Sequence, residues 1–472
     1  MDIKKAAMIN AVGKYTRIGL SVLVSAILAR LLSAEDFGVV AIIMAFSAFF
    51  GTFSDMGFGS AIVQKKDLTD EDLNNIFSFS VYVGLILMVL FSVLSYPISL
   101  FYNNPEFVKL GILLSFQLLF CSLDMVPNGV LCRDKKFTTI SIGTVVIYVA
   151  TSAVTILLAK LGLKYYALVI QSIVSSLFLL IWDCSFANIR LRFKAKFDFG
   201  SIRKILNYSS YQMAFNFVNY FSRYLDSLLT GKYIGAADLG YYNKAYSLIL
   251  YPVNNISGTI SPVLHPILSD YQDRKDIIFE KHVKLVKLLA CIGLFIAAVF
   301  YLAADEIIGI MYGDKWQNSI TCFRILSLAI VPQMINGSTG SIFLSLGSSK
   351  LLFINGCINS AVTIIAIMIG VFWGKTIEIL SICVVIAYIF HFVSASFMLP
   401  HYGFKCSLWK YCKVFIPEMC IFIVLTAAVL LFPFRIESLV LSGLVKGFYL
   451  GVIFIASLFI SKEHRVFRIL FR

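Results

Sequence analysis

The chain has 472 residues, of which 59% are hydrophobic and only 14% are charged. Soluble domains carry about 25% charged residues, so this composition excludes a soluble enzyme, a soluble nucleic-acid binder and a secreted disulfide scaffold. A membrane-spanning helix needs about 20 mostly apolar residues, and the chain has room for well over ten of them with short loops. The composition therefore predicts an all-α polytopic membrane protein without a soluble catalytic domain.

Apolar runs divide the chain into fourteen candidate transmembrane helices. They begin near residues 8, 37, 76, 108, 138, 164, 207, 239, 283, 318, 351, 377, 412 and 437. If the N-terminus is cytoplasmic, the inner connections carry 26 Lys and Arg residues and the outer connections carry 5. Because Lys and Arg accumulate on the cytoplasmic side, this asymmetry predicts that both termini are cytoplasmic. It also accounts for the net charge of +14 without a nucleic-acid partner.

Signals for enzymes, metals and disulfides are weak throughout the sequence. The ten cysteines include no C-x-x-C pair, which argues against disulfides and zinc. The segment 370–376 resembles a phosphate-binding loop, but its glycines are one residue too close together. A Gly-x-Ser-x-Gly nucleophile motif is missing as well. We therefore expect no enzymatic activity, no metal site and no cofactor.

The sequence contains traces of an internal duplication. Segment 29–38 recurs 202 residues later as segment 231–240, with alanine, aspartate and glycine in the same places. The shared residues are Ala34, Asp36 and Gly38 in the first copy and Ala236, Asp238 and Gly240 in the second. Six predicted helices separate the copies, so both have the same orientation in the membrane.

The duplication predicts two six-helix lobes related by a pseudo-twofold axis along the membrane normal. Residues 1–187 would form the first lobe and residues 207–400 the second. The basic segment 188–206 would be a cytoplasmic linker between them. Residues 401–472 would add two further helices and a cytoplasmic tail outside the repeat.

Cationic side chains within or at the edges of the spans are candidates for binding an anionic substrate, because each is costly in hydrocarbon unless paired or hydrated. The candidates are Lys14, Arg17, Arg223, Lys244, Arg324 and Lys446. Lys14 and Arg17 share a helix face, so they either line an inner vestibule or snorkel to the cytoplasmic interface. Lys446 lies deep within its span, and Glu418 on the neighbouring helix is considered as its partner.

Aspartates within the spans are candidates for ion coupling. Asp226 follows Arg223 by three residues on the same face. The two either form a structural ion pair, or Asp226 takes up a proton or sodium ion and frees Arg223 to bind phosphate. Asp55 either couples an ion or packs two helices through a hydrogen bond. Asp124, close to Pro127, is expected to make a local structural hydrogen bond.

The predicted helix that begins near residue 239 carries Pro252, Gly258, Pro262 and Pro266. Proline removes a backbone hydrogen bond and clashes with the preceding turn, so this helix is expected to bend or break. An irregular helix at this depth would suit either a moving gate or a static kink.

Three stretches of the sequence carry motifs. Residues 239–246 read LGYYNKAY and are followed by Pro252 and Pro262, residues 312–316 read YGDKW, and residues 32–38 read LSAEDFG. These stretches resemble the "LGYYxxA…P" signature, the "YGxxW" element and the first-lobe motif of bacterial polysaccharide transporters. The resemblance covers essentially the whole chain.

This resemblance implies the fold of the multidrug/oligosaccharidyl-lipid/polysaccharide exporter superfamily. It implies an ion-coupled flippase in the bacterial cytoplasmic membrane that moves undecaprenyl-pyrophosphate-linked repeat units of O-antigen (lipopolysaccharide), capsule or exopolysaccharide. Its partners would be the glycan lipid, membrane lipid, a proton or sodium ion and a glycan polymerase. The alternatives are a lipid II flippase or a drug/cation antiporter of the same superfamily, and a membrane glycosyltransferase or polymerase.

Overall fold

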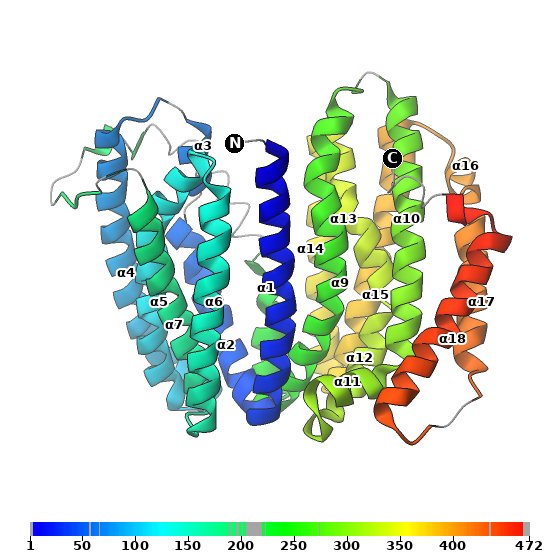
Figure 1. Cartoon of the computed structure of the whole chain (residues 1–472), viewed down its shortest axis with the longest axis horizontal. Coiled ribbons are helices and arrows are strands. Elements are labelled where there is room, and N and C mark those ends of the chain that lie inside the picture. The colour runs from blue at the N-terminus through cyan, green and yellow to red at the C-terminus, as the bar shows by residue number, and fades with distance from the viewer. Residues whose placement is uncertain are drawn as a thin grey trace. The chain divides into compact units, whose positions relative to one another are not determined.

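The computed structural model describes residues 3–55, 58–65, 67–187, 189, 191–194, 198–200, 202–203, 220–221, 223–272, 274–433 and 436–465. Within these residues the chain is helical and contains no strand (Figure 1). The predicted all-α class is confirmed. The side chain of Asp55, one of the two ion-coupling candidates, lies outside the described part of the structure.

The helices of the N-terminal half follow one another through short connections. They are α1 (Ile3–Leu31), α2 (Ala34–Asp55), α3 (Phe58–Gln64), α4 (Asp70–Tyr102), α5 (Glu106–Arg133), α6 (Phe137–Lys160) and α7 (Tyr165–Phe186). Residues 223–233 are also helical, and α9 (Ala236–Ser269) follows them.

The C-terminal half continues with longer spans and several short helices. They are α10 (Lys275–Leu302), α11 (Ala304–Tyr312), α12 (Asn318–Ser327), α13 (Ile330–Ser345), α14 (Ser349–Ile369), α15 (Ile377–Met398), α16 (Leu408–Lys413), α17 (Ile416–Leu430) and α18 (Leu439–Ile460). A 3₁₀ turn, Asp314–Trp316, follows α11, and π-helical turns extend α14 (Gly370–Gly374) and α15 (Leu399–Phe404).

The number of spans agrees with a polytopic membrane protein. In the described residues, ten segments are long and apolar enough to cross a membrane, and the bent pair α12 and α13 makes an eleventh. The shorter apolar α17 and the 34-residue α9 lie at two further predicted positions. Residues 207–219 of the predicted seventh helix lie outside the described part of the chain.

The helix break lies in a different place from the one predicted. α9 continues without interruption from Ala236 to Ser269, through Pro252, so the expected break there is wrong, whereas a bend within α9 stays a prediction. A proline removes only one backbone hydrogen bond, so the other backbone hydrogen bonds of this long helix keep the segments before and after Pro252 continuous. The chain instead bends by 52° between α12 and α13. Pro332 explains this bend, because its ring would clash with the carbonyl of Leu328 four residues earlier.

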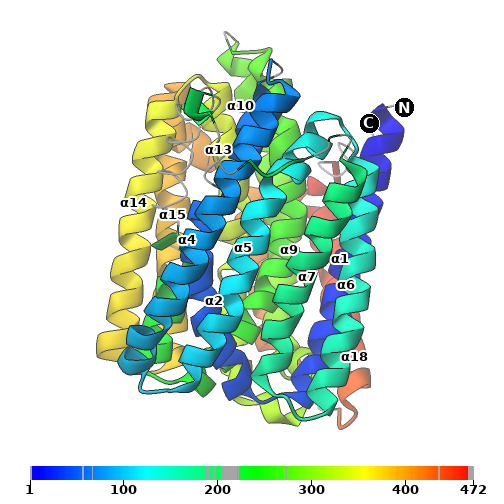
Figure 2. The same cartoon turned by 90° about the vertical axis from the view of Figure 1, so that its left-hand side faces the viewer.

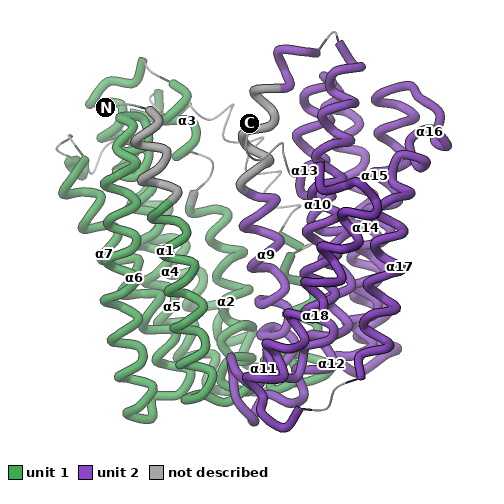
Figure 3. The backbone as a smooth tube through the Cα atoms, turned by 45° about the vertical axis from the view of Figure 1, so that its right-hand side comes forward, with its two compact units in different colours: residues 1–240 green, residues 241–472 purple. Residues whose placement is uncertain are grey.

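The chain forms two compact units, residues 1–240 and 241–472 (Figure 3). This boundary differs from the linker expected at 188–206, because residues 220–240 pack on the first unit. The hydroxyl of Tyr220 donates to the carbonyl of Ala45 at 3.1 Å, and that of Tyr102 donates to the carbonyl of Leu228 at 2.9 Å.

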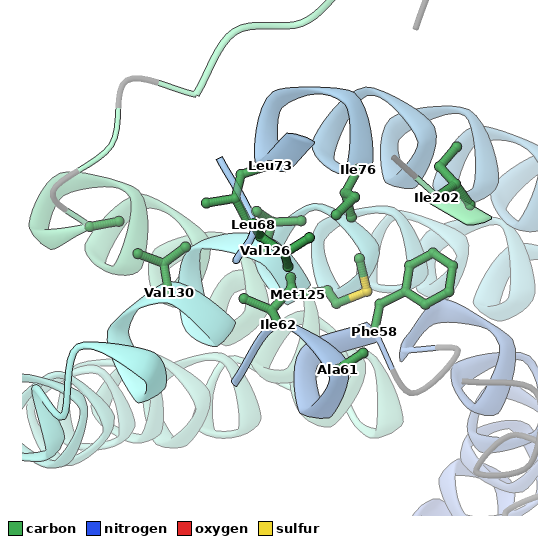
Figure 4. Close-up of a cluster of buried hydrophobic side chains, with 11 residues drawn as sticks. Phe58, Ala61, Ile62, Leu68, Leu73, Ile76, Met125, Val126, Val130 and Ile202 are labelled. Carbon is green, nitrogen blue, oxygen red and sulfur yellow. The ribbon is translucent and has the colours of Figure 1, made fainter. Parts of the chain in front are cut away.

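The described part of the expected linker is also attached to the first unit. The backbone N–H of Arg192 donates to Asn74 Oδ1 at 2.6 Å, and that of Lys194 donates to Ser78 Oγ at 2.9 Å. Ile202 is buried in an apolar cluster with residues of α3, α4 and α5. The cluster is made of Phe58, Ala61, Ile62, Leu68, Leu73, Ile76, Met125, Val126, Val130, Ala187 and Ile202 (Figure 4).

Small residues bring neighbouring spans of the first unit into close contact. α4 and α5 lie side by side along their length (Figure 2). A Cβ atom on Gly111 would lie 2.3 Å from the Cβ of Ser95, and one on Gly84 would lie 3.0 Å from that of Ser122. Membrane helices associate mainly through such packing, because lipid supplies no hydrophobic driving force between them.

The duplicated segments meet each other through their equivalent residues. α2 begins at Ala34 and α9 begins at Ala236, which are equivalent positions of the duplication. A Cβ atom on Gly38 would lie 1.7 Å from the carbonyl oxygen of Ala236, and one on Gly240 would lie 1.9 Å from that of Ala34. The contact is therefore reciprocal, as two copies related by a twofold axis require.

The reciprocal contact predicts that Gly38→Ala destabilises the protein, because the new methyl group would overlap a backbone oxygen that cannot move away alone. Overpacking of this kind costs about 1–3 kcal/mol. Gly51→Ala in the same helix is the matched control, since its Cβ meets no described atom within 4 Å. Thermal unfolding in detergent should show a lower melting temperature for Gly38→Ala only. Equal melting temperatures for the two variants would contradict the assigned contact.

Candidate functional site

The cations on α1 lie at the surface of the first unit. Lys14 and Arg17 are both exposed, and the Arg17 guanidinium lies 5.9 Å from the ring centroid of Tyr148 on α6. Exposed cations near the start of a span can either snorkel or contact a ligand. Both interpretations of Lys14 and Arg17 remain predictions.

Arg223 and Asp226 lie in different environments although they are three residues apart. The Arg223 side chain is exposed, whereas Asp226 is only 8% exposed. Asp226 Oδ1 accepts the backbone N–H of Ser227 at 2.6 Å. Among the described residues, the ion pairs do not include one between Arg223 and Asp226. The structure therefore leaves the Arg223 guanidinium accessible.

Two cations of the second unit lie against aromatic rings. Lys244 Nζ on α9 lies 5.4 Å from the ring centroid of Tyr312 on α11. The guanidinium of Arg324 on α12 lies 6.0 Å from the ring centroid of Tyr301. Its Nη2 atom lies 2.5 Å from Asp305 Oδ2. Arg324 therefore already has a carboxylate counter-ion.

Lys446 is paired, but with a residue other than the one predicted. Its Nζ lies 2.6 Å from Glu306 Oε1, and the same oxygen accepts the hydroxyl of Ser442 at 2.6 Å. Glu306 lies on α11, and Ser442 lies one turn before Lys446 on α18. The suggestion that Glu418 partners Lys446 is wrong, because Glu418 lies 3.3 Å from Lys287 instead.

Lys287 on α10 forms a second buried ionic cluster. Its Nζ lies 2.6 Å from Glu463 Oε1 and 3.3 Å from Glu418 Oε1, and all three side chains are nearly buried. Glu418 belongs to α17, and Glu463 follows α18. The cluster thus ties both C-terminal helices to α10.

These two clusters hold α17 and α18 on the second unit. An apolar core between them joins α10 to both helices through Cys291, Leu294, Ile421, Leu425 and Leu450. Glu306 and Lys287 were not among the residues predicted to pair. Ser442 and Lys446 are four residues apart and therefore share one helix face, which could have indicated an acidic partner on the neighbouring helix.

A pair of carboxyl groups in the first unit was also missed. Asn128 Nδ2 on α5 donates to Asp183 Oδ2 on α7 at 2.8 Å, and Asp124, one turn before Asn128 on α5, lies near Asp183. The structure thus places Asp124 near a second carboxyl group on another helix. The local hydrogen bond expected of Asp124 near Pro127 stays a prediction, since Asp124 Oδ1 has no partner among the described residues.

The second unit contains a polar cavity at the middle of its spans. The cavity has a volume of about 250 Å³ and lies among α9, α13, α14 and α15. It is lined by Val253, Asn254, Ser257, Gly258, Gln333, Asn336, Gly337, Asn359, Tyr388 and His391. Among the described residues, these walls carry amides, hydroxyls and an imidazole but no carboxylate, lysine or arginine. Charged residues do not indicate this cavity, although neutral amides within apolar spans are visible in the sequence.

Comparison with known families identifies the chain. Residues 27–321 match the family model described as polysaccharide biosynthesis protein, and this match covers more than half of the chain. The chain belongs to this polysaccharide biosynthesis family. The predicted relationship to polysaccharide transporters is thereby confirmed.

Relatives within the family are named for glycan biosynthesis. The chain is 26% identical over 306 residues to the teichuronic acid biosynthesis protein TuaB of Bacillus subtilis (strain 168), covering 63% of this chain and 62% of that protein. It is 22% identical over 366 residues to the lipopolysaccharide biosynthesis protein WzxC of Escherichia coli (strain K12), covering 76% and 73%. The matched part thus spans less than two thirds of the length of TuaB.

Solved structures share the fold of this family member. The chain is similar to the lipid II flippase MurJ in an inward closed conformation, with a TM-score of 0.75 at 15% identity over 98% of this chain and 100% of that one. A multidrug resistance MATE family transporter of the MOP superfamily gives a TM-score of 0.63 at 18% identity, covering 83% and 93%. The protein is therefore a multi-pass membrane protein with a MOP-like fold, as predicted. In its described residues, clusters of three or more His, Cys, Asp or Glu that could hold a metal ion are absent.

The ionic contact between α11 and α18 predicts a stability effect that depends on both partners. Lys446→Met or Glu306→Gln alone should lower the melting temperature strongly, because each leaves one buried charge unpaired, at a cost of about 3–5 kcal/mol. Combining the two changes should recover most of the loss. Thermal unfolding of the purified protein measures this.

The exposed pair Glu280 and Lys284 on α10 offers a matched control, at 2.5 Å. Glu280→Gln with Lys284→Met should leave the melting temperature nearly unchanged, since exposed pairs contribute little. The assigned pairing would be contradicted if the double variant at Glu306 and Lys446 lost as much melting temperature as the two single variants lose in sum.

Proposed function

We propose that the protein moves undecaprenyl-pyrophosphate-linked oligosaccharide repeat units from the inner to the outer leaflet of the bacterial cytoplasmic membrane. The observation that carries this proposal is the family match over residues 27–321 in a chain with a flippase-like fold. Further support comes from the names of its relatives, which include WzxC and the succinoglycan biosynthesis transport protein ExoT of Rhizobium meliloti (strain 1021). These names and the fold support transport rather than catalysis.

The physical need for such a carrier follows from the chemistry of the substrate. A pyrophosphate and its sugars cannot cross about 30 Å of hydrocarbon without a polar path, whereas the polyprenyl tail can remain in lipid. In this proposal the two lobes alternate their access to the two sides, and a proton or sodium gradient resets the cycle. A glycan polymerase would use the translocated units.

Among the cationic candidates, the exposed ones are best suited to bind the pyrophosphate. Arg223, Lys14 and Arg17 have exposed side chains, so a ligand can reach them. Lys446 and Arg324 each contact a carboxylate at 2.6 Å or less, which argues for a structural role. We therefore assign the head group first to Arg223, with Lys14 and Arg17 as further contacts.

For the coupling ion, the buried aspartates are the candidates. Asp226 is nearly buried three residues from Arg223, and protonation there would alter the field at the guanidinium. The nearby carboxyl groups of Asp124 and Asp183 offer a second place for a proton. Asp55 remains a prediction from the sequence.

Lipid II is the second candidate substrate, favoured by the similarity to MurJ over 98% of the chain. At 15% identity this similarity concerns the fold. Reconstitution in proteoliposomes distinguishes the substrates: fluorescent undecaprenyl-pyrophosphate oligosaccharide should become accessible to an external quencher or glycosidase faster than lipid II does. Faster movement of lipid II would favour the second candidate, and movement of neither would refute both.

The assignment of the head group predicts that Arg223→Ala lowers the flipping rate at least tenfold, because the pyrophosphate loses a guanidinium that can form charge-assisted hydrogen bonds with it. Arg274→Ala is the matched control, since Arg274 is an exposed arginine whose contact is Asp276 at 3.5 Å. Both variants should fold and reconstitute like the wild type. An Arg223→Ala variant that flips at the wild-type rate would remove Arg223 from the substrate site.

The coupling assignment predicts that Asp226→Asn abolishes gradient-driven flipping, and that Arg223→Gln combined with Asp226→Asn does not restore it. A structural ion pair would behave differently, because removing both members relieves the unpaired charge. Proteoliposomes with and without an imposed proton or sodium gradient measure this. Recovery in the double variant would refute coupling at Asp226. Loss of coupling in Asp183→Asn but not in Asp226→Asn would transfer the role to the Asp124–Asp183 pair.

A further inference from the structure

The polar cavity of the second unit lies at a depth where polar surface is costly. Asn359 is the eleventh of the 21 residues in α14, so it lies at the middle of its span. Asn254, Gly258 and Gly337, which also line the cavity, are exposed at the surface of the unit. Hydrocarbon does not solvate amide groups, so a cavity of this kind belongs on a hydrated path rather than against lipid.

Several polar groups of the cavity lack a hydrogen-bond partner. In the described part of the chain, these atoms are Gln333 Nε2, Asn336 Nδ2 and Asn359 Oδ1. Gln333 is only 7% exposed, so water outside the protein does not readily compensate for its missing bond. A buried donor or acceptor without a partner costs about 1–3 kcal/mol. Three such groups at one cavity mark a place where water or a ligand would be stabilising.

The other walls of the cavity are held in place by contacts with neighbouring helices. His391 Nε2 lies 2.9 Å from the carbonyl oxygen of Asn359 and 3.1 Å from Thr363 Oγ1. The hydroxyl of Tyr388 is hydrogen-bonded to that of Tyr246. These bonds orient the imidazole and the tyrosine ring before any ligand enters, which reduces the entropic cost of binding.

The residues that line the cavity define the chemistry of a suitable ligand. Several of them are amides, which carry both a donor and an acceptor, so a ligand that both accepts and donates hydrogen bonds suits the cavity. A phosphate would need cations, and a metal ion would need several charged oxygen ligands, and the lining residues that the structure describes supply neither. Hydroxyl groups both donate and accept, and the Tyr388 ring offers an apolar face to a sugar ring.

We propose that the cavity formed by Asn254, Gln333, Asn336, Asn359 and Tyr388 binds one sugar residue of the transported glycan. This inference rests on the proposed function, and it adds a neutral saccharide subsite to the cationic contacts for the pyrophosphate. The volume of about 250 Å³ holds roughly eight water molecules, at about 30 Å³ each, which one sugar ring would largely displace. The subsite would select glycans by the hydroxyl and amide pattern of that residue.

Gly258 provides a test that leaves the surrounding packing intact. A Cβ atom on Gly258 meets no described atom within 4 Å, so a leucine there fills the cavity. Gly356→Leu on α14 is the matched control, because its Cβ also meets no described atom and Gly356 lies outside the cavity. Leucine favours a helix over glycine by up to about 1 kcal/mol, so both variants should unfold at or above the wild-type temperature.

Saturation-transfer NMR on the full-length purified protein measures binding, with the methyl glycosides of glucose, galactose and N-acetylglucosamine as probes at millimolar concentration. At least one glycoside should receive saturation from the wild type and from Gly356→Leu, and at least fivefold less from Gly258→Leu. Equal signals from Gly258→Leu and the wild type would overturn the subsite. If no glycoside gives the wild type a stronger signal than Gly258→Leu, the subsite is also overturned, and the cavity is then filled by water alone.

A second variant separates sugar binding from folding. Gln333→Met keeps the length of the side chain and removes an unpartnered amide, so it should weaken glycoside binding without lowering the melting temperature. Unchanged binding in Gln333→Met would count against the subsite. The flipping assay gives an independent result. If Gly258→Leu abolishes glycoside binding but the wild type flips no glycan lipid, the proposed function is refuted and the subsite is retained. If the wild type flips glycan lipid but binds no glycoside at this cavity, the subsite is refuted and the proposed function is retained.

Discussion

Hydrocarbon offers no hydrogen bonds, so the polar groups that this chain carries into the bilayer must find their partners within the protein. Most of the structure reflects this constraint. Lys446 contacts Glu306 and Lys287 contacts Glu418 and Glu463, so charges that would be costly alone instead attach α17 and α18 to the second unit. The same constraint makes the exceptions informative, because groups left without partners at one place indicate where a ligand or water belongs.

Close packing of small residues is the second determinant of the fold. Helices in lipid approach each other most closely where glycine, alanine and serine meet. The contacts of Gly111 with Ser95 and of Gly38 with Ala236 are of this kind. The second of these has a counterpart between Gly240 and Ala34, the equivalent positions of the other copy, so the duplication and the packing of the present protein depend on the same small residues. An asymmetric substitution there would disturb one half of a reciprocal contact.

The polar groups of the spans fall into classes that suit different parts of a transport cycle. The buried pair of Lys446 on α18 and Glu306 on α11 stabilises the second unit. Arg223 is exposed, and we have proposed it for an anionic head group, whereas the neutral cavity among α9, α13, α14 and α15 is proposed for sugar hydroxyls.

The sequence by itself determined the class of the protein, because span length, hydrophobicity and loop charge are local properties that a bilayer imposes on any chain. It predicted the helical class, nearly all helix positions and the family, and it located the duplicated segments that meet at Gly38 and Gly240. It could not decide which charges are paired. Lys446 and Glu306 are 140 residues apart, and Asp124 and Asp183 lie on different helices, so their proximity depends on how helices pack and at what height. The cavity likewise exists only because amides from three separate helices face the same space. No one of these amides stands out in the sequence of its own helix. Such convergence is a property of the tertiary structure, since the spacing of residues along one helix says nothing about the side chains on its neighbours.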